Sequence, residues 1–333
     1  MNNFIEQLKQ SGLRGRSGSN FPVWQKWQAV KNTHSSKKYV VCNGSEGEPM
    51  IFKDKYILQN YLKEVMLGIT IALKEIGAQG AYIYLKKEYY QQLKKNILPL
   101  IENLPIEIFE KPEGYLCGEE TALINAIEGK EPFPKIKPPY PTEKGLWGNP
   151  TLIHNVETFY CIAKIAQNQY RHTKFFCVNG DVPHPGVFEL PEQATIEKIL
   201  KQTENLPPFD FFVQAGGWAS GEIFLPHELR QPLNGLASII VFHAQKHQAT
   251  QMLEKLLDFF SRENCDRCTP CREGIYRLSE IAQKLVSNKI PHTQYQTIED
   301  ILQALKYSSL CPLGKTAAVS LGSYLKKLFV YDN

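Results

Sequence analysis

Apolar side chains recur every three or four positions along three stretches of the chain. In the first stretch, residues 62–76, the apolar positions are Leu62, Val65, Met66, Ile69, Leu73 and Ile76. This spacing predicts an amphipathic helix, and the same period returns in Val156–Ala166 and from residue 250 onward. The last of these stretches predicts a helical bundle at the C-terminal end.

Short runs of β-branched and aromatic residues lie between the helical stretches. Tyr39–Val41 and Ala81–Leu85 predict strands before and after the helix over residues 62–76. Strands that alternate with amphipathic helices predict an α/β domain. A Pro- and Gly-rich stretch, Pro132–Pro150, predicts an extended loop that interrupts this domain.

The pattern changes near residue 174, where short strand candidates are separated by Gly and Pro. These candidates are Phe175–Asn179, Gly186–Leu190, Phe211–Gln214 and Ser238–Phe242. They predict a small β-rich module. The chain is therefore expected to form three domains: an α/β domain over residues 1–170, a β-rich domain over 171–245 and a helical domain over 246–333.

Composition narrows the class of protein. Of the 333 residues, 43% are hydrophobic and 22% are charged, as in a water-soluble globular protein. The net charge of +4 is spread along the chain, so no nucleic-acid footprint is expected.

The first nine residues include Glu6 and lack the apolar core of a secretory signal. The apolar stretch Val65–Leu85 is interrupted by charges and glycines, which argues against direct membrane insertion. A cytoplasmic location is expected, with any association with the cytoplasmic membrane made peripherally through partner subunits.

Four of the eight cysteines are organised. Cys265, Cys268 and Cys271 have C-x-x-C-x-x-C spacing, and Cys311 follows, directly before Pro312. Three thiolates at this spacing can approach one cubane from a single turn of chain, and its fourth iron then needs one remote ligand. The pattern predicts a 4Fe–4S cluster with these four ligands. The alternatives are a structural zinc site, although zinc ribbons pair two C-x-x-C knuckles, and four inert buried thiols.

The other cysteines are scattered. Without an export signal, they are expected to be thiols and not disulfides. Cys42 and Cys117 are expected to pack as small apolar residues. Cys161 and Cys177 have no partner pattern.

Three further motifs each have a functional and a structural interpretation. The glycine-rich start, Gly12–Pro22, can bring backbone N–H groups and arginines to a phosphate, or can be a plain surface loop. The acidic turn Asn43–Pro49 follows a predicted strand, where α/β proteins bind ligands, or is a turn with solvated acids. The acids of Gly118–Leu123 and the pair His154–Asn155 precede helices, so the helix dipole and capping can explain both.

Taken in order, these segments resemble the NADH-oxidising flavoprotein subunit of respiratory complex I. The segments that carry the resemblance are Gly12–Trp27, Cys42–Asp54, Cys117–Leu123, Lys137–Pro141, Gly145–Thr151, Asn155–Thr158, Cys265–Gly274 and Leu310–Gly314. The same family includes the diaphorase subunits of NAD-linked hydrogenases and formate dehydrogenases. The resemblance covers essentially the whole chain.

The resemblance implies a Rossmann-like flavin and NADH domain, a ubiquitin-like β-grasp domain and a helical bundle carrying the cluster. It implies an NADH dehydrogenase subunit that passes electrons from NADH through FMN to the 4Fe–4S cluster and on to partner subunits. The expected partners are a thioredoxin-like 2Fe–2S subunit and a multi-cluster ferredoxin-like subunit.

The resemblance also assigns residues to each ligand. The FMN contacts are Arg16, Gly18, Lys26, Asn43, Glu46, Gly118, Glu119 and Asn155. The NADH contacts are Phe21 and Tyr140, which stack on adenine, and Lys137. The catalytic polar contacts are Glu48 and Glu120.

The chain departs from the family pattern near the flavin loop. The family reads Gly-Arg-Gly-Gly-Ala-Gly-Phe-Pro-Thr-Gly where this chain has Ser17, Ser19, Asn20, Val23 and Trp24. Outside the loop, Ala29, Ser45 and His154 replace an aromatic residue, an acid and an asparagine. Two alternative functions follow: a non-catalytic relay or scaffold subunit that keeps the cluster without binding NADH, or an FMN protein whose electron donor is another protein.

Overall fold

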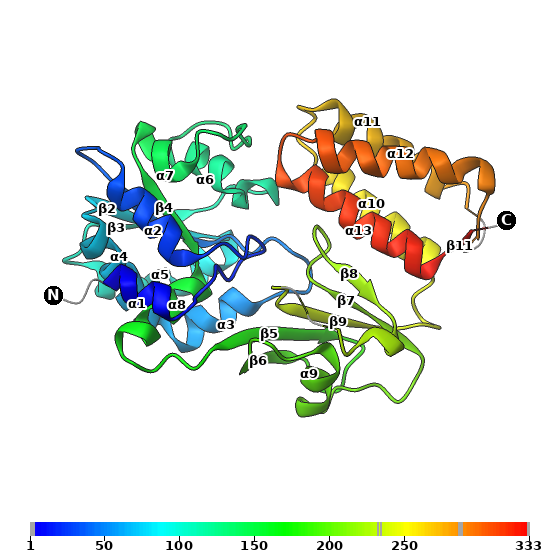
Figure 1. The fold of residues 1–333 in the computed structure, drawn as a ribbon, viewed down its shortest axis with the longest axis horizontal. Coiled ribbons are helices and arrows are strands. Elements are labelled where there is room, and N and C mark those ends of the chain that lie inside the picture. Colours follow the sequence, from blue (N-terminus) through cyan, green and yellow to red (C-terminus); the bar gives the residue numbers. More distant parts are fainter. Residues whose placement is uncertain (1–3, 232, 234, 286–288, 332–333) are drawn as a thin grey trace. The chain divides into compact units, whose positions relative to one another are not determined.

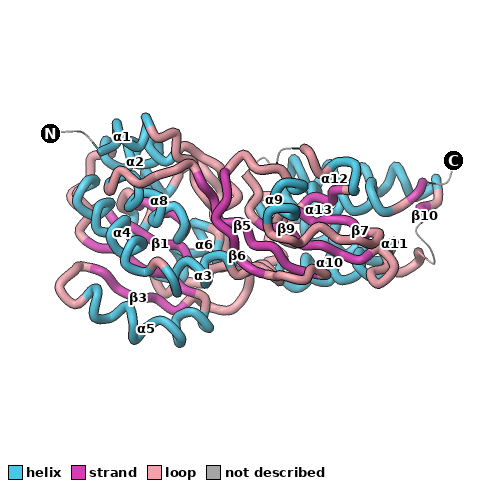
Figure 2. The backbone as a smooth tube through the Cα atoms, turned by 90° about the horizontal axis from the view of Figure 1, so that it is seen from below, coloured by secondary structure: helices cyan, strands magenta, loops and turns pink. Residues whose placement is uncertain are grey.

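The structure, a computed structural model, describes residues 4–231, 233, 235–285 and 289–331. The chain forms two compact units (Figures 1 and 2). The first contains residues 1–47 and 52–175, and the second contains residues 48–51 and 176–333. The segment 48–51 therefore belongs to the second unit, although the first unit both precedes and follows it. Over the described residues, no helix has the length and apolar character needed to cross a membrane.

The first unit is built on a four-stranded parallel sheet. Its strands are β1 (Tyr39–Gly44), β2 (Gly80–Leu85), β3 (Ile106–Glu110) and β4 (Thr151–Asn155), in the order β3-β2-β1-β4. The direction of the connections reverses between β1 and β4, and open α/β sheets bind ligands outside the carboxyl ends of the strands at such a point. Asn43 and Asn155 are register partners at this edge.

Helices cover both faces of this sheet. They are α1 (Phe4–Gln10), α2 (Val23–Asn32), α3 (Lys53–Asn60), α4 (Leu62–Ile76), α5 (Lys87–Ile101), α6 (Glu120–Ile127), α7 (Pro141–Lys144) and α8 (Val156–Ala166), with 3-10 turns at Leu116–Gly118 and Leu146–Gly148. Helix α6 packs with Val41 and Ile153 on one face, while α4 and α8 pack against each other and against β1. Gly68 allows this close packing, because a Cβ there would collide with the Phe159 carbonyl of α8.

The second unit begins with a five-stranded mixed sheet. Its strands are β5 (Thr173–Gly180), β6 (Gly186–Pro191), β7 (Phe211–Ala215), β8 (Glu222–Phe224) and β9 (Ser238–His243), in the order β6-β5-β9-β7-β8. Strand β9 is parallel to β5 and antiparallel to β7. The helix α9 (Ile196–Gln202) buries Ile196, Ile199 and Leu200 in the core of this sheet.

Four helices follow the mixed sheet. They are α10 (Ala249–Glu263), α11 (Thr269–Ala282), α12 (His292–Ser308) and α13 (Pro312–Leu328), and their consecutive contacts form a bundle. The 3-10 turn Pro226–Glu228 and the parallel pair β10 (Lys289–Ile290) and β11 (Val330–Tyr331) complete the described elements. Within this unit, α13 packs on β8: Ser320 Oγ donates to the Trp218 carbonyl at 2.9 Å, and Ser323 Oγ accepts from Ile223 N–H at 2.8 Å.

Most predicted elements are confirmed. The helices over 62–76 and 156–166, the strands at 39–41 and 81–85, the four strands after residue 174 and the C-terminal helices are all present. The prediction of an extended loop over 132–150 is only partly right, because α7 and a 3-10 turn interrupt it. Pro141 stands at the first turn of α7, where a missing N–H costs no hydrogen bond.

Candidate functional site

Two asparagines define the carboxyl edge of β1 and β4. Asn155 caps α8, because its Oδ1 accepts from Glu157 N–H at 3.0 Å. Its Nδ2 donates to Asp54 Oδ2 at 2.6 Å. Asn43 Nδ2 donates to the Gly118 carbonyl at 3.0 Å, which ties the 3-10 turn before α6 to the end of β1. The sequence predicted the capping role of Asn155; the structure adds that both amides hold this edge together.

A cluster of buried charged side chains contacts this edge. Lys53 Nζ lies 2.6 Å from Asp54 Oδ1 and 3.0 Å from Glu157 Oε2, and it also donates to Asn155 Oδ1 at 3.1 Å. Burial works to lower the pKa of Lys53, but the carboxylates of Asp54 and Glu157 outweigh burial and raise it. Glu157 was not predicted as a site residue. The sequence feature that could have indicated its role is its position as an acid in the first turn of a predicted helix that is otherwise apolar.

Glu46 is a second, partly buried acid at this edge. Its Oε1 accepts from Asp54 N–H at 2.9 Å, at the start of α3, and its Oε2 accepts from the Tyr89 hydroxyl at 2.6 Å. The interpretation of this turn as solvated acids is therefore wrong for Glu46. Burial, followed by the nearby charge of Asp54, raises the pKa of Glu46 to about 7.

This pKa predicts a pH dependence of stability. The folded pKa of Glu46 lies above its unfolded value of 4.5, so its contribution is fully present below pH 4.5 and is lost as pH rises through 7. Between pH 5 and 8, the free energy of unfolding is expected to fall by up to roughly 3 kcal/mol from this group. Urea unfolding of the Glu46→Gln variant should show a flatter pH profile over this range. An unchanged profile would contradict the assignment.

A charged trio stands at the start of α6. Glu120 lies between Lys26, with Nζ–Oε2 at 3.2 Å, and Lys137, with Nζ–Oε1 at 2.8 Å. Burial works to raise the pKa of Glu120, but the charges of Lys26 and Lys137 outweigh it and hold the pKa below the ordinary value. Glu120 is therefore ionised at neutral pH and acts as an acceptor. Glu119 caps α6 by accepting from Thr121 N–H at 2.7 Å and also pairs with Lys137 at 3.1 Å.

His154 lies on β4, near Lys26. Trp27 Nε1–H donates to His154 Nε2 at 3.0 Å. Burial, reinforced by the charge of Lys26, lowers the pKa of His154 well below its usual value. The imidazole is therefore neutral, and because Nε2 accepts, its proton resides on Nδ1. His154 acts as a strand residue with a fixed tautomer; only Asn155 caps the following helix.

Hydrogen bonds to its own backbone carbonyls stabilise the conformation of the glycine-rich loop. Arg14 Nε donates to the Asn20 carbonyl at 2.8 Å, and Gly15 N–H donates to the Phe21 carbonyl at 2.8 Å. Asn20 has a φ of +45°, a left-handed conformation that asparagine tolerates better than most residues. Asn20 therefore has a backbone conformation that glycine also adopts readily. Arg16 is buried and donates to the Tyr170 hydroxyl at 2.7 Å. Gly18 lies in open space, since a Cβ there would meet no atom within 4 Å.

The remaining residues that were predicted to contact NADH differ in exposure and in location. Phe21 and Tyr140 are 47% and 51% exposed, which is high for aromatic side chains. Both belong to the first unit. Glu48 belongs to the second unit, where its Oε2 accepts from Ala219 N–H at 3.1 Å and its carboxyl group lies against Gly217.

The four organised cysteines gather at two helix starts. Cys268 precedes α11, Cys271 lies in its first turn, and Cys311 precedes α13. Burial raises the pKa of the Cys271 thiol to about 12, followed by the charges of Cys268, Cys311 and Cys265. Burial also raises the pKa of Cys311, while backbone N–H groups of Leu313 and Gly314 donate to its sulfur and oppose the shift.

The donor set of four cysteines fits the chemistry of a 4Fe–4S cubane, which is held by thiolates. Among the described residues, no group of three or more His, Cys, Asp or Glu side chains is arranged to hold a single metal ion. Helix starts carry partial positive charge, so both α11 and α13 favour an anionic cluster at this position.

The lone cysteines are buried, and Cys42 behaves as expected. Burial, followed by the charge of Asp54, raises the pKa of Cys42 well above its usual value, so its thiol stays protonated. Cys117, Cys161 and Cys177 are also buried. The predicted burial of Cys42 and Cys117 is confirmed, and the Cys117 thiol also donates to the Glu113 carbonyl at 3.0 Å.

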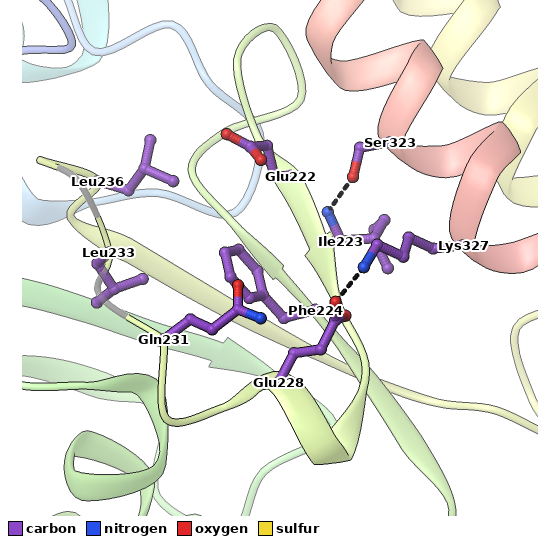
Figure 3. Close-up of a pocket in the computed structure, with 9 residues that line it drawn as sticks. All are labelled: Glu222, Ile223, Phe224, Glu228, Gln231, Leu233, Leu236, Ser323 and Lys327. Atoms are coloured by element: carbon purple, nitrogen blue, oxygen red, sulfur yellow. Dashed lines mark hydrogen bonds and ion pairs between the residues drawn. The ribbon is translucent and has the colours of Figure 1, made fainter.

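A cavity of about 420 Å³ lies in the second unit (Figure 3). It is lined by Glu222, Ile223, Phe224, Glu228, Gln231, Leu233, Leu236, Ser323 and Lys327. Two of the lining residues, Lys327 and Glu228, form an ion pair. Ser323 and Lys327 lie in the C-terminal half of α13, far along the helix from Cys311, and no residue assigned to a cofactor lines the cavity.

Comparisons with known proteins identify the family of the chain. Residues 8–164 match the family model of the Nuo51 FMN-binding domain, and residues 251–329 match that of the NADH-ubiquinone oxidoreductase-F iron-sulfur binding region. The chain is 32% identical to an NADH-quinone oxidoreductase subunit of Aquifex aeolicus, covering 97% of this chain and 83% of that protein. It is 30% identical to the mitochondrial NADH dehydrogenase [ubiquinone] flavoprotein 1 of Dictyostelium discoideum, over 94% and 74%.

A solved structure gives the same picture. A chain in the crystal structure of the NAD+-reducing NiFe hydrogenase in the H2-reduced state superposes with a TM-score of 0.87 at 28% identity. The match covers 98% of this chain, which spans 62% of that hydrogenase chain. None of these comparisons supports the non-catalytic alternative. This chain belongs to the flavoprotein family of the NADH-quinone oxidoreductases, which joins an FMN-binding domain to an iron–sulfur binding region.

Proposed function

We propose that this chain is the electron-entry subunit of a multisubunit redox complex and oxidises NADH. Bound FMN supplies the conversion of two-electron hydride chemistry into one-electron transfer, and the 4Fe–4S cluster relays the electrons. The observation that carries the proposal is the charged trio Lys26, Glu120 and Lys137 at the carboxyl edge of the parallel sheet. This is where α/β folds bind nucleotides, and the FMN-binding family model covers all three residues.

The residues at this edge fit FMN. The second N–H of the Asn43 amide and the ammonium group of Lys26 offer donors to a polar ring edge or a ribityl chain. Gly118 packs closely against Ser45, because a Cβ at residue 118 would collide with Ser45 Oγ. We assign FMN contacts to Arg16, Gly18, Lys26, Asn43, Glu46, Gly118, Glu119 and Asn155. Glu46 and Asn155 cap α3 and α8, so they also position this edge.

NADH is assigned to the exposed side of the same unit. Phe21 and Tyr140 offer aromatic faces to an adenine ring, and Lys137 offers positive charge to the phosphates. Glu120 is ionised, so it orients the nicotinamide as a hydrogen-bond acceptor. Glu48 is proposed as a second polar contact to NADH.

The cluster is assigned to Cys265, Cys268, Cys271 and Cys311. The partial exposure of Cys265 and Cys268, against the burial of the other two, supports an exit for electrons on the side of the C-x-x-C run. Partner subunits are proposed to include a thioredoxin-like 2Fe–2S subunit and a multi-cluster ferredoxin-like subunit. Through such partners the chain would lie at the cytoplasmic face of a membrane.

A three-domain division is proposed within the two units, with boundaries near residues 170 and 245. The strand order β6-β5-β9-β7-β8, with β5 and β9 parallel, supports a ubiquitin-like β-grasp domain between them. The helical domain then begins at α10, before the first cluster cysteine.

The first experiment is to purify the protein anaerobically, quantify FMN and iron per chain, and titrate the flavin absorbance with NADH. One FMN, about four irons and saturable bleaching by NADH are expected. Bleaching only by a reduced ferredoxin would favour a protein electron donor. Full iron without flavin would favour a relay or scaffold subunit.

The Lys137→Met variant tests the nucleotide assignment. It leaves the two partly buried carboxylates of Glu119 and Glu120 without their shared cation, so the site is expected to repel the phosphates of NADH. We expect KM for NADH to rise by about tenfold, about 1.4 kcal/mol, with FMN content unchanged. Lys130→Met is the matched control, since the exposed Lys130 pairs with Glu128 away from this trio. Equal KM values in both variants would overturn the assignment.

A further inference from the structure

Ser309 is a buried hydroxyl with nothing to bond to among the described residues. It lies in the turn between α12 and α13, two residues before Cys311, and is 4% exposed. Its Oγ has no hydrogen-bond partner in the part of the chain that the structure describes. A buried hydroxyl without a partner is costly, so native structures seldom keep one without a bonding partner of another kind.

The surroundings of Ser309 show where its hydroxyl lies. A Cβ built on Gly314 would collide with Ser309 Oγ and would lie 3.6 Å from Cys271 Cβ. The hydroxyl therefore packs directly against Gly314, on the side of this glycine that also faces the Cys271 side chain. Gly314 N–H donates to Cys311 from the same turn of α13. Ser309 thus stands among groups that surround two of the four proposed ligands.

We infer that Ser309 Oγ–H donates a hydrogen bond to a sulfur of the 4Fe–4S cluster, either a thiolate of Cys271 or Cys311 or a neighbouring sulfide, and raises the reduction potential of the cluster. The bond gives the hydroxyl the partner it lacks. A donor to sulfur stabilises the more negative, reduced cluster more than the oxidised one. Ser309 therefore adjusts how readily this relay accepts an electron. The inference rests on the proposed ligation by these cysteines.

The test compares two isosteric variants, Ser309→Thr and Ser309→Val, by EPR-monitored redox titration of the cluster in the full-length protein. The two side chains have the same shape, and only threonine keeps the hydroxyl. The potential of the valine variant is expected to lie about 59 mV below that of the threonine variant, a tenfold change in the one-electron equilibrium. The threonine variant is expected to stay close to the wild type.

Ser320→Ala is the matched control. Ser320 is also buried on α13 and donates to the Trp218 carbonyl, but it lies about two and a half helical turns beyond Cys311. Its loss should lower stability and leave the potential unchanged. Equal potentials in the threonine and valine variants, with about four irons in each, would overturn the role of Ser309 alone. A wild-type chain that binds no cluster would instead overturn the proposed ligation.

Discussion

Replacing Cys311 by alanine is expected to abolish the cluster. Cys311 is the one remote ligand of the proposed set, and it enters from a different helix than the C-x-x-C-x-x-C run. Without it, one iron of a cubane loses its thiolate and the helix start of α13 loses its anionic neighbour. Iron and acid-labile sulfide per chain should fall from about four to near zero, and the EPR signal of the reduced cluster should disappear.

Flavin chemistry gives the internal control for this result. Reduction of bound FMN by NADH should persist in Cys311→Ala, because the FMN residues belong to the first unit. Transfer to an acceptor that needs the cluster should stop. Cys161→Ala is the matched variant, since Cys161 is also a buried cysteine but lies on α8. Full iron content in Cys311→Ala, or equal loss in both variants, would refute the assigned ligand set.

Replacing Lys53 by methionine is expected to destabilise the protein by about 3–5 kcal/mol. Lys53 neutralises two buried acids, Asp54 and Glu157, at 2.6 and 3.0 Å. Methionine fills similar volume but leaves both carboxylates buried without a cation. Their alternative is to take up protons, so the loss should be largest at neutral pH and smaller near pH 4.

Lys55→Met provides the comparison on the same helix. Lys55 pairs with Glu88 at 2.6 Å, but both side chains are accessible to solvent, so its replacement should cost at most about 1 kcal/mol. Urea unfolding followed by circular dichroism measures both values on one protein background. Similar losses in the two variants would mean that the Lys53 cluster is hydrated and that its charges are screened.

The sequence predicted elements with a regular apolar period and missed several others. Helices α4 and α8 pack through continuous apolar faces, so their period is visible in the chain itself. Helix α5 and strands β3, β4 and β8 were not predicted. Strand β8 has three residues, too few to show alternation, and depends on its pairing with β7. Helix α7 lies within a Pro-rich stretch whose composition favours a loop.

The helix-capping roles of site residues could be predicted from the sequence, whereas the burial of their side chains could not. The capping of α8 by Asn155 and of α6 by Glu119 follows from residue type and position. The burial of Glu46 does not, because an acid in a turn rich in glycine and serine is typical of a solvated surface. Its environment comes from Tyr89, on a helix much later in the chain. The positive φ of Asn20 likewise could not be predicted from the residue type alone.

The segment 48–51 has a consequence for the order in which the protein matures. Asn179 Nδ2 donates to the Met50 carbonyl, and Ala219 N–H donates to Glu48, so this segment bonds to residues made far later. At about 5–20 residues per second, a ribosome needs roughly ten to thirty seconds to travel from residue 51 to residue 219. During that interval the segment 48–51 has none of these final partners. A fragment ending at residue 175 would keep this segment in that state permanently.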